Sequence, residues 1–361
     1  MRAAVIGTGL IGGSIGLALA GLGHEVTGFD RDADRLARAL ELGAVATAAA
    51  SVEDAARDAD VAFVALPVGA IADAVLQLLD AGVPLVTDVG SVKGPVVAEV
   101  ARRCPSRAAR FIGGHPMAGS EQDGIDGARA DLFVGAAWVA TPTPETPLDA
   151  YTTLRGLLRD LGAEVVEVTP DEHDLFVSFV SHVPQVAAST LMDVATKHEA
   201  EHGALLRLAA GGFRDMTRIA ASQSTIWLDI LTANRDAILS ALDAYLAGLQ
   251  HARDLVEAGD REGLGAMLDR ARAARRNLPV GIPASAKLVE LRVPVPDRAG
   301  VLAEVTTLAG RLGVNIYSFD IAHSKEGGAG VLELVVAEAD AGAFEDGLHE
   351  LGYHSGRVDI P

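Results

Sequence analysis

The sequence contains a single cysteine, Cys104, in 361 residues, so an intramolecular disulfide is excluded and no cysteine-based metal motif is present. Basic residues are also few: 30 Lys and Arg against 49 Asp and Glu give a net charge of −19. This balance argues against nucleic acids and anionic membranes as partners, because their phosphates attract positive charge. We expect no metal, and an anionic small molecule would need a local cluster of Arg or His.

Long hydrophobic runs are missing as well. No uninterrupted apolar segment reaches the ~18 residues that a membrane span requires. The first residues, Met1–Gly7, lead into a strand pattern without the apolar core and cleavage site of a signal peptide. We therefore expect a cytoplasmic protein. Hydrophobic residues nevertheless make up 49% of the chain, enough for large cores, and the length suggests two or three domains.

Short apolar runs alternate with helix-like segments over residues 1–168. The runs are rich in Val, Ala and Ile without strict polar alternation, which is typical of strands covered on both faces. Such alternation predicts an α/β domain of the Rossmann type, with a doubly wound and mostly parallel sheet. The expected strands are residues 3–6, 25–29, 61–65, 85–88, 110–112, 136–140 and 164–168.

The pattern changes to nearly continuous helix over residues 169–276. Apolar residues recur there at spacings of three and four, and helices this apolar pack on each other or on a second subunit. We therefore predict an all-α domain that forms a homodimer. Residues 277–286 are rich in Pro and Gly and indicate a linker. Residues 287–361 follow a βαββαβ pattern, which predicts a ferredoxin-like domain.

A glycine-rich loop follows the first expected strand and opens a helix pattern. Its glycines allow a tight turn and bring a pyrophosphate close to the helix N-terminus. Asp30 ends the second strand, where a carboxylate binds a ribose 2′-hydroxyl and repels the 2′-phosphate of NADP, although Arg31 beside it weakens that exclusion. We predict NAD as the cofactor rather than a mere packing turn. The loop residues are Gly7, Thr8, Gly9, Leu10, Ile11 and Gly12.

Five positions fall at or just past the C-terminal ends of the expected strands, the edge of a parallel sheet where ligands bind. They are the glycine loop, Asp30, Leu66-Pro67, Ser91 and His115. We expect them to meet in one crevice. Ser91 is suited to bind a ligand or orient His115, and equally to cap the helix that follows.

His115 lies between Gly114 and Pro116, on a predicted turn with little side-chain bulk. That setting favours a group exposed to a pocket over a packed core residue. A histidine facing a nicotinamide can take a hydroxyl proton while hydride leaves the same carbon. We therefore predict that His115 is the catalytic base of an NAD-dependent dehydrogenase. Lys93, in contrast, is expected at the solvated surface, with a contact to a phosphate as the alternative.

The helical segment offers further candidates. Asp215 and Arg218 are three residues apart and share a helix face, and the Arg fork matches a substrate carboxylate. An ordinary surface ion pair is one alternative. Arg214 is another candidate for the carboxylate, although it lies on a different helix face. His182 by itself is better explained as a core histidine. His173 belongs to an acidic first helical turn, and we expect no direct catalytic role for it.

Together these segments resemble the prephenate/arogenate dehydrogenase family of tyrosine biosynthesis. The matching motifs occur in the family's order and cover residues 1 to about 275. The C-terminal segment resembles an ACT domain, a module that commonly binds amino acids and regulates its host enzyme. The motifs are Gly7–Ser14, Asp88–Lys93, Gly113–Glu121, Ser181–Pro184 and Gly211–Ala220 with Trp227, and in the ACT-like segment Pro296–Leu302 and Gly313–Ile316.

The resemblance implies NAD-dependent oxidative decarboxylation of prephenate, with arogenate as the alternative substrate. It assigns proton removal to His115, assistance to Ser91 and the substrate carboxylate to Arg218. It also implies a tyrosine effector at the ACT domain. Residues implied to line the substrate pocket are His182, Ser120, Asp215 and Trp227, and those implied in regulation are Asp297, Gly300 and Asn315.

Two departures and two rival functions remain open. Gln185 replaces a second histidine of the family pattern, which leaves the choice of substrate undecided, and Gln223 stands where the family has Asp or Asn before Pro. A non-catalytic amino-acid sensor would have no need to retain His115, Ser91 and Arg218. A hydroxyacid dehydrogenase would need a catalytic lysine, and only Lys197, in a solvated helical setting, lies between residues 171 and 274.

Overall fold

The computed structural model describes the chain apart from residues 119–123, 203–204, 277–287, 297, 324–328 and 360–361. The chain forms two compact units, Met1–His251 and Ala252–Pro361. Two residues with predicted roles, Ser120 and Asp297, lie outside the described residues. The predicted limits of the domains stay predictions.

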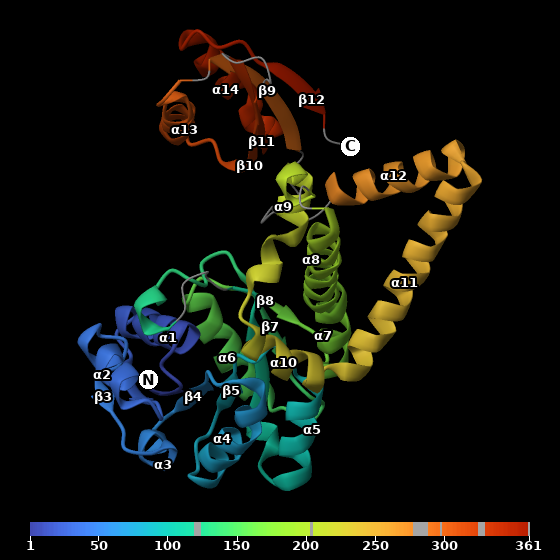
Figure 1. Ribbon diagram of the computed structural model, residues 1–361. Helices are drawn as coiled ribbons and strands as arrows, with labels where there is room; N and C mark the ends of the chain where they lie inside the picture. The colour runs from blue at the N-terminus through green and yellow to red at the C-terminus, as the bar shows by residue number, and fades with distance from the viewer. Residues whose placement is uncertain (119–123, 203–204, 277–287, 297, 324–328, 360–361) are drawn as a thin grey trace. The chain divides into compact units, whose positions relative to one another are not determined.

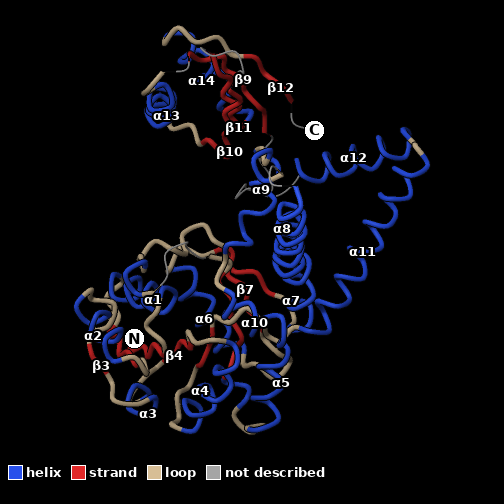
Figure 2. Tube along the Cα trace, viewed as in Figure 1, coloured by secondary structure: helices blue, strands red, loops and turns tan. Residues whose placement is uncertain are grey.

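An eight-stranded sheet forms the centre of the first unit (Figures 1 and 2), with the strand order β3-β2-β1-β4-β5-β6-β7-β8. Neighbouring strands pair in parallel, except that β6 and β7 are antiparallel. The mostly parallel sheet of the Rossmann type is thus confirmed. The strands are β1 (Arg2–Ile6), β2 (Glu25–Phe29), β3 (Thr47–Ala48), β4 (Val61–Val64), β5 (Val86–Asp88), β6 (Phe111–Pro116), β7 (Ala137–Thr141) and β8 (Glu164–Glu167).

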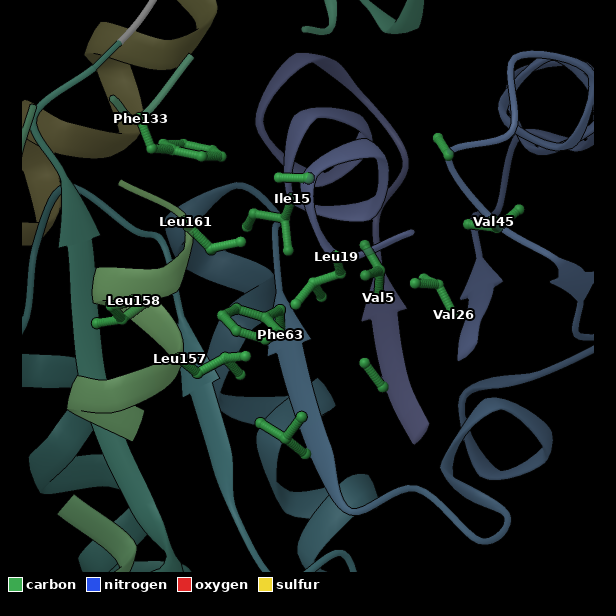
Figure 3. Packing of buried hydrophobic residues seen from close by; sticks show 14 of the residues in the cluster. Val5, Ile15, Leu19, Val26, Val45, Phe63, Phe133, Leu157, Leu158 and Leu161 are labelled. Atoms are coloured by element: carbon green, nitrogen blue, oxygen red, sulfur yellow. The ribbon is translucent and has the colours of Figure 1, made fainter. Parts of the chain in front are cut away.

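Helices cover both faces of this sheet and enclose two cores. Alternate residues of β1 point to opposite sides: Val5 belongs to one core and Ile6 to the other. Figure 3 shows the first core, where Leu19 and Leu157 approach Phe63 on the sheet. Burial on both faces explains why the strands lack polar alternation. The covering helices are α1 (Leu10–Gly21), α2 (Ala33–Glu41), α3 (Val52–Ala56), α4 (Val68–Asp80), α5 (Gly94–Arg103) and α6 (Leu148–Asp160).

The predicted helical segment is confirmed, with more breaks than its sequence pattern suggests. Its elements are α7 (Pro170–Val177), a π-helical turn η3 (Ser178–His182), α8 (Val183–His202), α9 (Gly211–Thr217), the 3-10 turn η5 (Arg218–Ala221), α10 (Ser224–Ala233), α11 (Arg235–Ala258) and α12 (Arg261–Arg276). The helix α7 packs on α5 and β7 and thereby joins this segment to the sheet.

One helical run of the described chain, Pro170–Glu199, is long and apolar enough to span a membrane by length and composition alone. Core helices of soluble proteins pass the same test. The π-helical turn interrupts this run. The buried side of the run carries the polar residues His173, Asp174 and His182. These features are those of a helix that packs on protein.

The second unit contains a four-stranded antiparallel sheet with the order β10-β11-β9-β12. Two helices pack on one face, where Leu308 and Phe344 meet Leu291 and Leu334 in a separate core. This is the βαββαβ order predicted from the sequence. Its elements are β9 (Leu288–Pro296), α13 (Val301–Leu312), β10 (Ile316–His323), β11 (Ala329–Ala337), α14 (Glu338–Glu350) and β12 (Gly356–Asp359).

Candidate active site

The glycine loop between β1 and α1 is shaped by close backbone contacts. Gly7 has a φ of +92°, and a Cβ there would lie 2.3 Å from the carbonyl oxygen of Ala65. A Cβ on Gly12 would lie 1.8 Å from the carbonyl oxygen of Gly7, so both positions require glycine. The first turn of α1 holds no acidic residue, and its N–H groups stay available to an anion.

Asp30 is buried beside this loop at the end of β2. Its Oδ2 accepts a hydrogen bond from the backbone N–H of Thr8 at 2.8 Å, and its Oδ1 accepts one from Asp32 at 2.9 Å. The guanidinium of Arg35 lies 3.6 Å away. The carboxylate is thus held in place next to the loop, as the binding of ribose hydroxyls requires.

A pocket of about 380 Å³ opens next to the loop. Its lining includes Gly9–Gly12, Leu66, Pro67 and Ser91 of the predicted crevice. Asp30 and His115 are not among the lining residues, so the meeting of all five positions stays a prediction. The opposite wall comes from α10, which packs on α4 (Figure 1). Sequence reasoning did not anticipate the α10 residues, since no local signal marks them. They are Thr225, Ile226, Asp229 and Ile230. The glycine cradle, the fixed carboxylate and this pocket fit a dinucleotide.

Ser91 lines the pocket and does not cap a helix, because α5 begins at Gly94 with Lys93 in the N-cap position. The expectation for Lys93 was wrong: its side chain is fully buried. Its Nζ forms an ion pair with Asp88 and donates to the carbonyl oxygen of Gly114 at 2.9 Å. Burial lowers the pKa of Lys93, and the Asp88 carboxylate opposes that shift.

The Asp88–Lys93 pair links the Ser91 loop to the strand that carries His115. Asp88 also accepts hydrogen bonds from the backbone N–H groups of Gly90 at 2.8 Å and Gly114 at 3.0 Å. The pair fits there because glycines occupy β6: a Cβ on Gly113 would lie 3.1 Å from Cδ of Lys93. The site therefore contains a fully buried ion pair that its local sequence does not reveal.

His115 lies within β6 and pairs with Val139 of β7, so it belongs to a strand rather than to the predicted turn. The strand extends past residue 112 because β7 continues the sheet on that side. The side chain is mostly buried. Burial lowers the pKa of His115 well below 6.5, and the neighbouring His173, Lys93 and His182 lower it further. The imidazole is therefore neutral near pH 7, as a base must be.

His173 contacts His115 directly, which corrects the prediction that it stays apart from the chemistry. Nε2 of His173 lies 2.8 Å from Nδ1 of His115, and its own Nδ1 lies 2.8 Å from Oδ1 of Asp174. The acidic first turn of α7 does exist, with Glu172 in a capping box. Helical periodicity turns His173, Asp174 and Val177 to the buried side, and this spacing was the overlooked signal.

His182 is buried in the π-helical turn, a feature found frequently at functional sites. Asn234 donates from Nδ2 to Nδ1 of His182 at 3.2 Å and to the carbonyl oxygen of Asp174 at 2.8 Å. Burial lowers the pKa of His182 to about 4, against the attraction of Asp174. The indole of Trp227 meets its ring edge-on, with 6.0 Å between centroids. The structure thus brings these two predicted residues together.

The other predicted substrate ligands lie elsewhere in the described chain. Arg218 is exposed at the start of η5, which packs on α8. Asp215 lines a second groove of about 560 Å³, beside the apolar residues Phe179, Met216 and Tyr245. Neither residue lines the pocket that contains Ser91. Their roles in substrate binding stay predictions.

Comparison with known proteins matches two sequence families. Residues 15–167 match the family described as prephenate dehydrogenase, nucleotide-binding domain, and residues 169–270 match prephenate dehydrogenase, dimerization domain. A prephenate dehydrogenase of Bacillus subtilis is 36% identical over 337 residues, which span 91% of this chain and 90% of that protein.

Solved structures show the same likeness. The prephenate dehydrogenase of A. aeolicus, in complex with hydroxyphenyl propionate and NAD+, has a TM-score of 0.71 at 28% identity and covers 76% of this chain and 97% of its own. The Synechocystis arogenate dehydrogenase has a TM-score of 0.69 at 30% identity, and the match covers 76% of this chain and 99% of that protein. From its motifs, its site and these matches, the chain belongs to the prephenate dehydrogenase family of NAD-dependent dehydrogenases.

Proposed function

We propose that the protein catalyses the NAD-dependent oxidative decarboxylation of prephenate to 4-hydroxyphenylpyruvate. One observation supports this most: a buried, neutral histidine, His115, stands on the strand next to the one that leads to Ser91 in the nucleotide pocket. A base in that place is suited to a hydroxyl on a carbon that must lose hydride. The identity to the Bacillus subtilis enzyme along most of the chain points to the same substrate.

The residues of the site have different roles in the reaction. NAD+, when bound, supplies the hydride acceptor for the ring carbon that carries the hydroxyl. His115 takes the hydroxyl proton through the ring nitrogen that does not contact His173, and Ser91 helps to orient the hydroxyl. Loss of the ring carboxylate as CO₂ leaves its bonding electron pair in the ring, which becomes aromatic. His182 and Trp227 form an apolar and weakly polar wall of the substrate pocket.

Arogenate is the second candidate substrate, because an arogenate dehydrogenase is among the similar structures. Prephenate carries a keto acid side chain where arogenate carries an amino acid, and Arg218 would hold the carboxylate of either. The test is NADH formation with NAD+ and each substrate in parallel. We expect turnover of prephenate. Turnover of arogenate alone would reverse the substrate assignment, and turnover of neither would reject the proposed function.

We also propose that the protein is a homodimer through its helical segment. The match to a dimerization domain supports this. So do the large apolar side chains that remain exposed there, among them Val180, Met216 and Leu246. Light scattering on the purified protein tests the proposal, and we expect a mass near twice the 37.2 kDa of one chain.

We further propose that residues 287–361 form an ACT-type regulatory domain that binds tyrosine. The segment has its own core and the βαββαβ order. Two of the implied residues are described: Gly300, with φ +94°, precedes α13, and Asn315 is exposed before β10. Removal of residues 285–361 should keep the activity and abolish inhibition by tyrosine. Inhibition that persists would mean that tyrosine competes at the active site.

A further inference from the structure

We propose that His173 and Asp174 form a positioning relay that holds His115 in the tautomer with a free Nε2. The inference rests on the proposed function and adds two residues to it. Three side chains form one line of contacts: Nδ1 of His115 to Nε2 of His173 at 2.8 Å, and Nδ1 of His173 to Oδ1 of Asp174 at 2.8 Å. All three belong to the first compact unit.

The protons of this line can be assigned by counting donors. An ionised carboxylate only accepts, so the hydrogen between Asp174 and His173 is on Nδ1 of His173. A neutral imidazole has one N–H, and therefore Nε2 of His173 carries a lone pair. That lone pair accepts the Nδ1–H of His115. Nε2 of His115 is then the unprotonated nitrogen, the atom that a base needs.

Asp174 is itself fixed by the start of α5. Oδ1 accepts from the backbone N–H of Lys93 at 2.7 Å, and Oδ2 accepts from that of Gly94 at 2.8 Å. Backbone N–H groups at a helix N-terminus favour an anion there. Lys93 is buried close by, and the Asp174 carboxylate raises the pKa of Lys93 against the effect of burial. The accepting end of the relay is thus held by the segment that carries Ser91, three residues before Gly94.

The relay has a second effect once His115 has taken a proton. The imidazolium would face the buried Lys93, and Lys93, His173 and His182 all lower the pKa of His115. Among the described residues, Asp174 is the anion that ends this line, and it acts on His115 through His173. The relay therefore orients the base first and then stabilises its charged form, against the opposing field of Lys93.

His182 shows that the arrangement is specific to His115. Its Nδ1 accepts from Asn234, which places its hydrogen on Nε2. The two histidines therefore present opposite groups: His115 an acceptor and His182 a donor. Both assignments trace back to Asp174 and Asn234, which also contact each other through the Asp174 carbonyl oxygen.

The decisive variant is Asp174→Asn. The amide puts an NH₂ group where one carboxylate oxygen now accepts a backbone N–H. With the NH₂ toward His173 the line of hydrogen bonds reverses and leaves His115 with its hydrogen on Nε2, and in either orientation the negative charge that stabilises protonated His115 is lost. We expect kcat to fall about 100- to 1000-fold, within the range for losing a general base, while the Kd for NAD+ stays unchanged. His173→Gln should lower kcat by a similar factor. Asp171→Asn, an exposed carboxylate in the same helical turn, is the matched control and should stay within about twofold of wild type.

A measurement on the wild-type protein tests the relay without any substrate. ¹⁵N NMR of histidine-labelled protein reports which ring nitrogen carries the hydrogen. We expect Nδ1–H for His115 and Nε2–H for His182, with the signal of His115 assigned by its loss in His115→Asn. A wild-type His115 with Nε2–H would overturn the proposal, and so would folded Asp174→Asn protein with the wild-type kcat and pH profile. Inactivity on both substrates would instead reject the proposed function and leave the NMR result standing.

Discussion

The sheet side and the helical side of this site supply different things. The sheet contributes the glycine loop, Ser91 and His115 at the ends of neighbouring strands. The helices contribute His173, Asp174 and His182, which contact His115 or set the charges around it. The comparison teaches that topology places the reacting groups, whereas packing between elements fixes their protonation. A strand end is a property of the fold, but a tautomer depends on a neighbour from elsewhere in the chain.

The largest effect tests the sheet side. His115→Asn should lower kcat by about three orders of magnitude, because it removes the base that takes the hydroxyl proton. The Kd for NAD+ should not change, since the glycine loop and Asp30 remain intact. Steady-state kinetics and a cofactor titration by fluorescence measure the two quantities. A normal kcat would remove His115 from the mechanism.

The sheet side was largely predictable from the sequence, for a physical reason. Parallel strands have their carboxyl ends at one edge, so Asp30, Ser91 and His115 could each be assigned to that edge without coordinates. The glycine loop was recognisable because the positions that cannot carry a Cβ, such as Gly7 and Gly12, recur at a fixed spacing in the sequence. The extension of β6 through His115 was not predictable, because it depends on pairing with the antiparallel β7.

The helical side was predicted only in part. Its helices follow from apolar spacing, but the contacts of His173 depend on α7 packing against α5 and β7. Lys93 was assigned to the surface because nothing adjacent in sequence marks its partner as buried. A lysine five residues after an aspartate that ends a buried strand is ambiguous in sequence alone. Only the fold shows that both side chains turn inward.

The second prediction concerns the buried charge of Lys93, which lies between the sheet side and the helical side of the site. Lys93→Met should lower the free energy of unfolding by about 3–5 kcal/mol, because Asp88 would keep a buried charge without its partner. Urea unfolding measures this, with Lys197→Met, on an exposed lysine of α8, as the control. The double variant with Asp88→Asn should recover part of the loss. A Lys93→Met protein as stable as wild type would show that the pair contributes nothing to folding.

The third prediction concerns a ligand from the helical side that the described pocket does not include. Arg218→Ala should raise KM for prephenate about 10- to 100-fold and change kcat much less, as expected when a charged hydrogen bond to the substrate is lost. Substrate titration at saturating NAD+ measures the split, with Arg235→Ala, an exposed arginine at the start of α11, as the control. An unchanged KM would mean that another group holds the substrate carboxylate, and the helical side would then only tune His115.

The smallest effect is on the acid side of the stability curve. The pKa of His182 is about 4 in the folded protein and near 6.5 when unfolded, because burial disfavours its charged form. Between these values the unfolded chain binds a proton that the native state does not. Stability therefore rises with pH from about 4 to 6.5 and then levels off.

His182→Gln should remove this contribution, so that the free energy of unfolding changes less steeply with pH, by at most about 1.4 kcal/mol per pH unit, the value for one proton. Part of the slope should remain, since the pKa of His115 is lowered in the same direction. Urea unfolding at pH 4.5, 5.5 and 7 gives the slope, and His251→Gln, an exposed histidine of α11, should retain the wild-type value. If the free energy of unfolding of the His182 variant has the same slope with pH as wild type, then native His182 takes up its proton without unfolding. The helical side would then hold the tautomer of His182 less firmly than the contact with Asn234 implies.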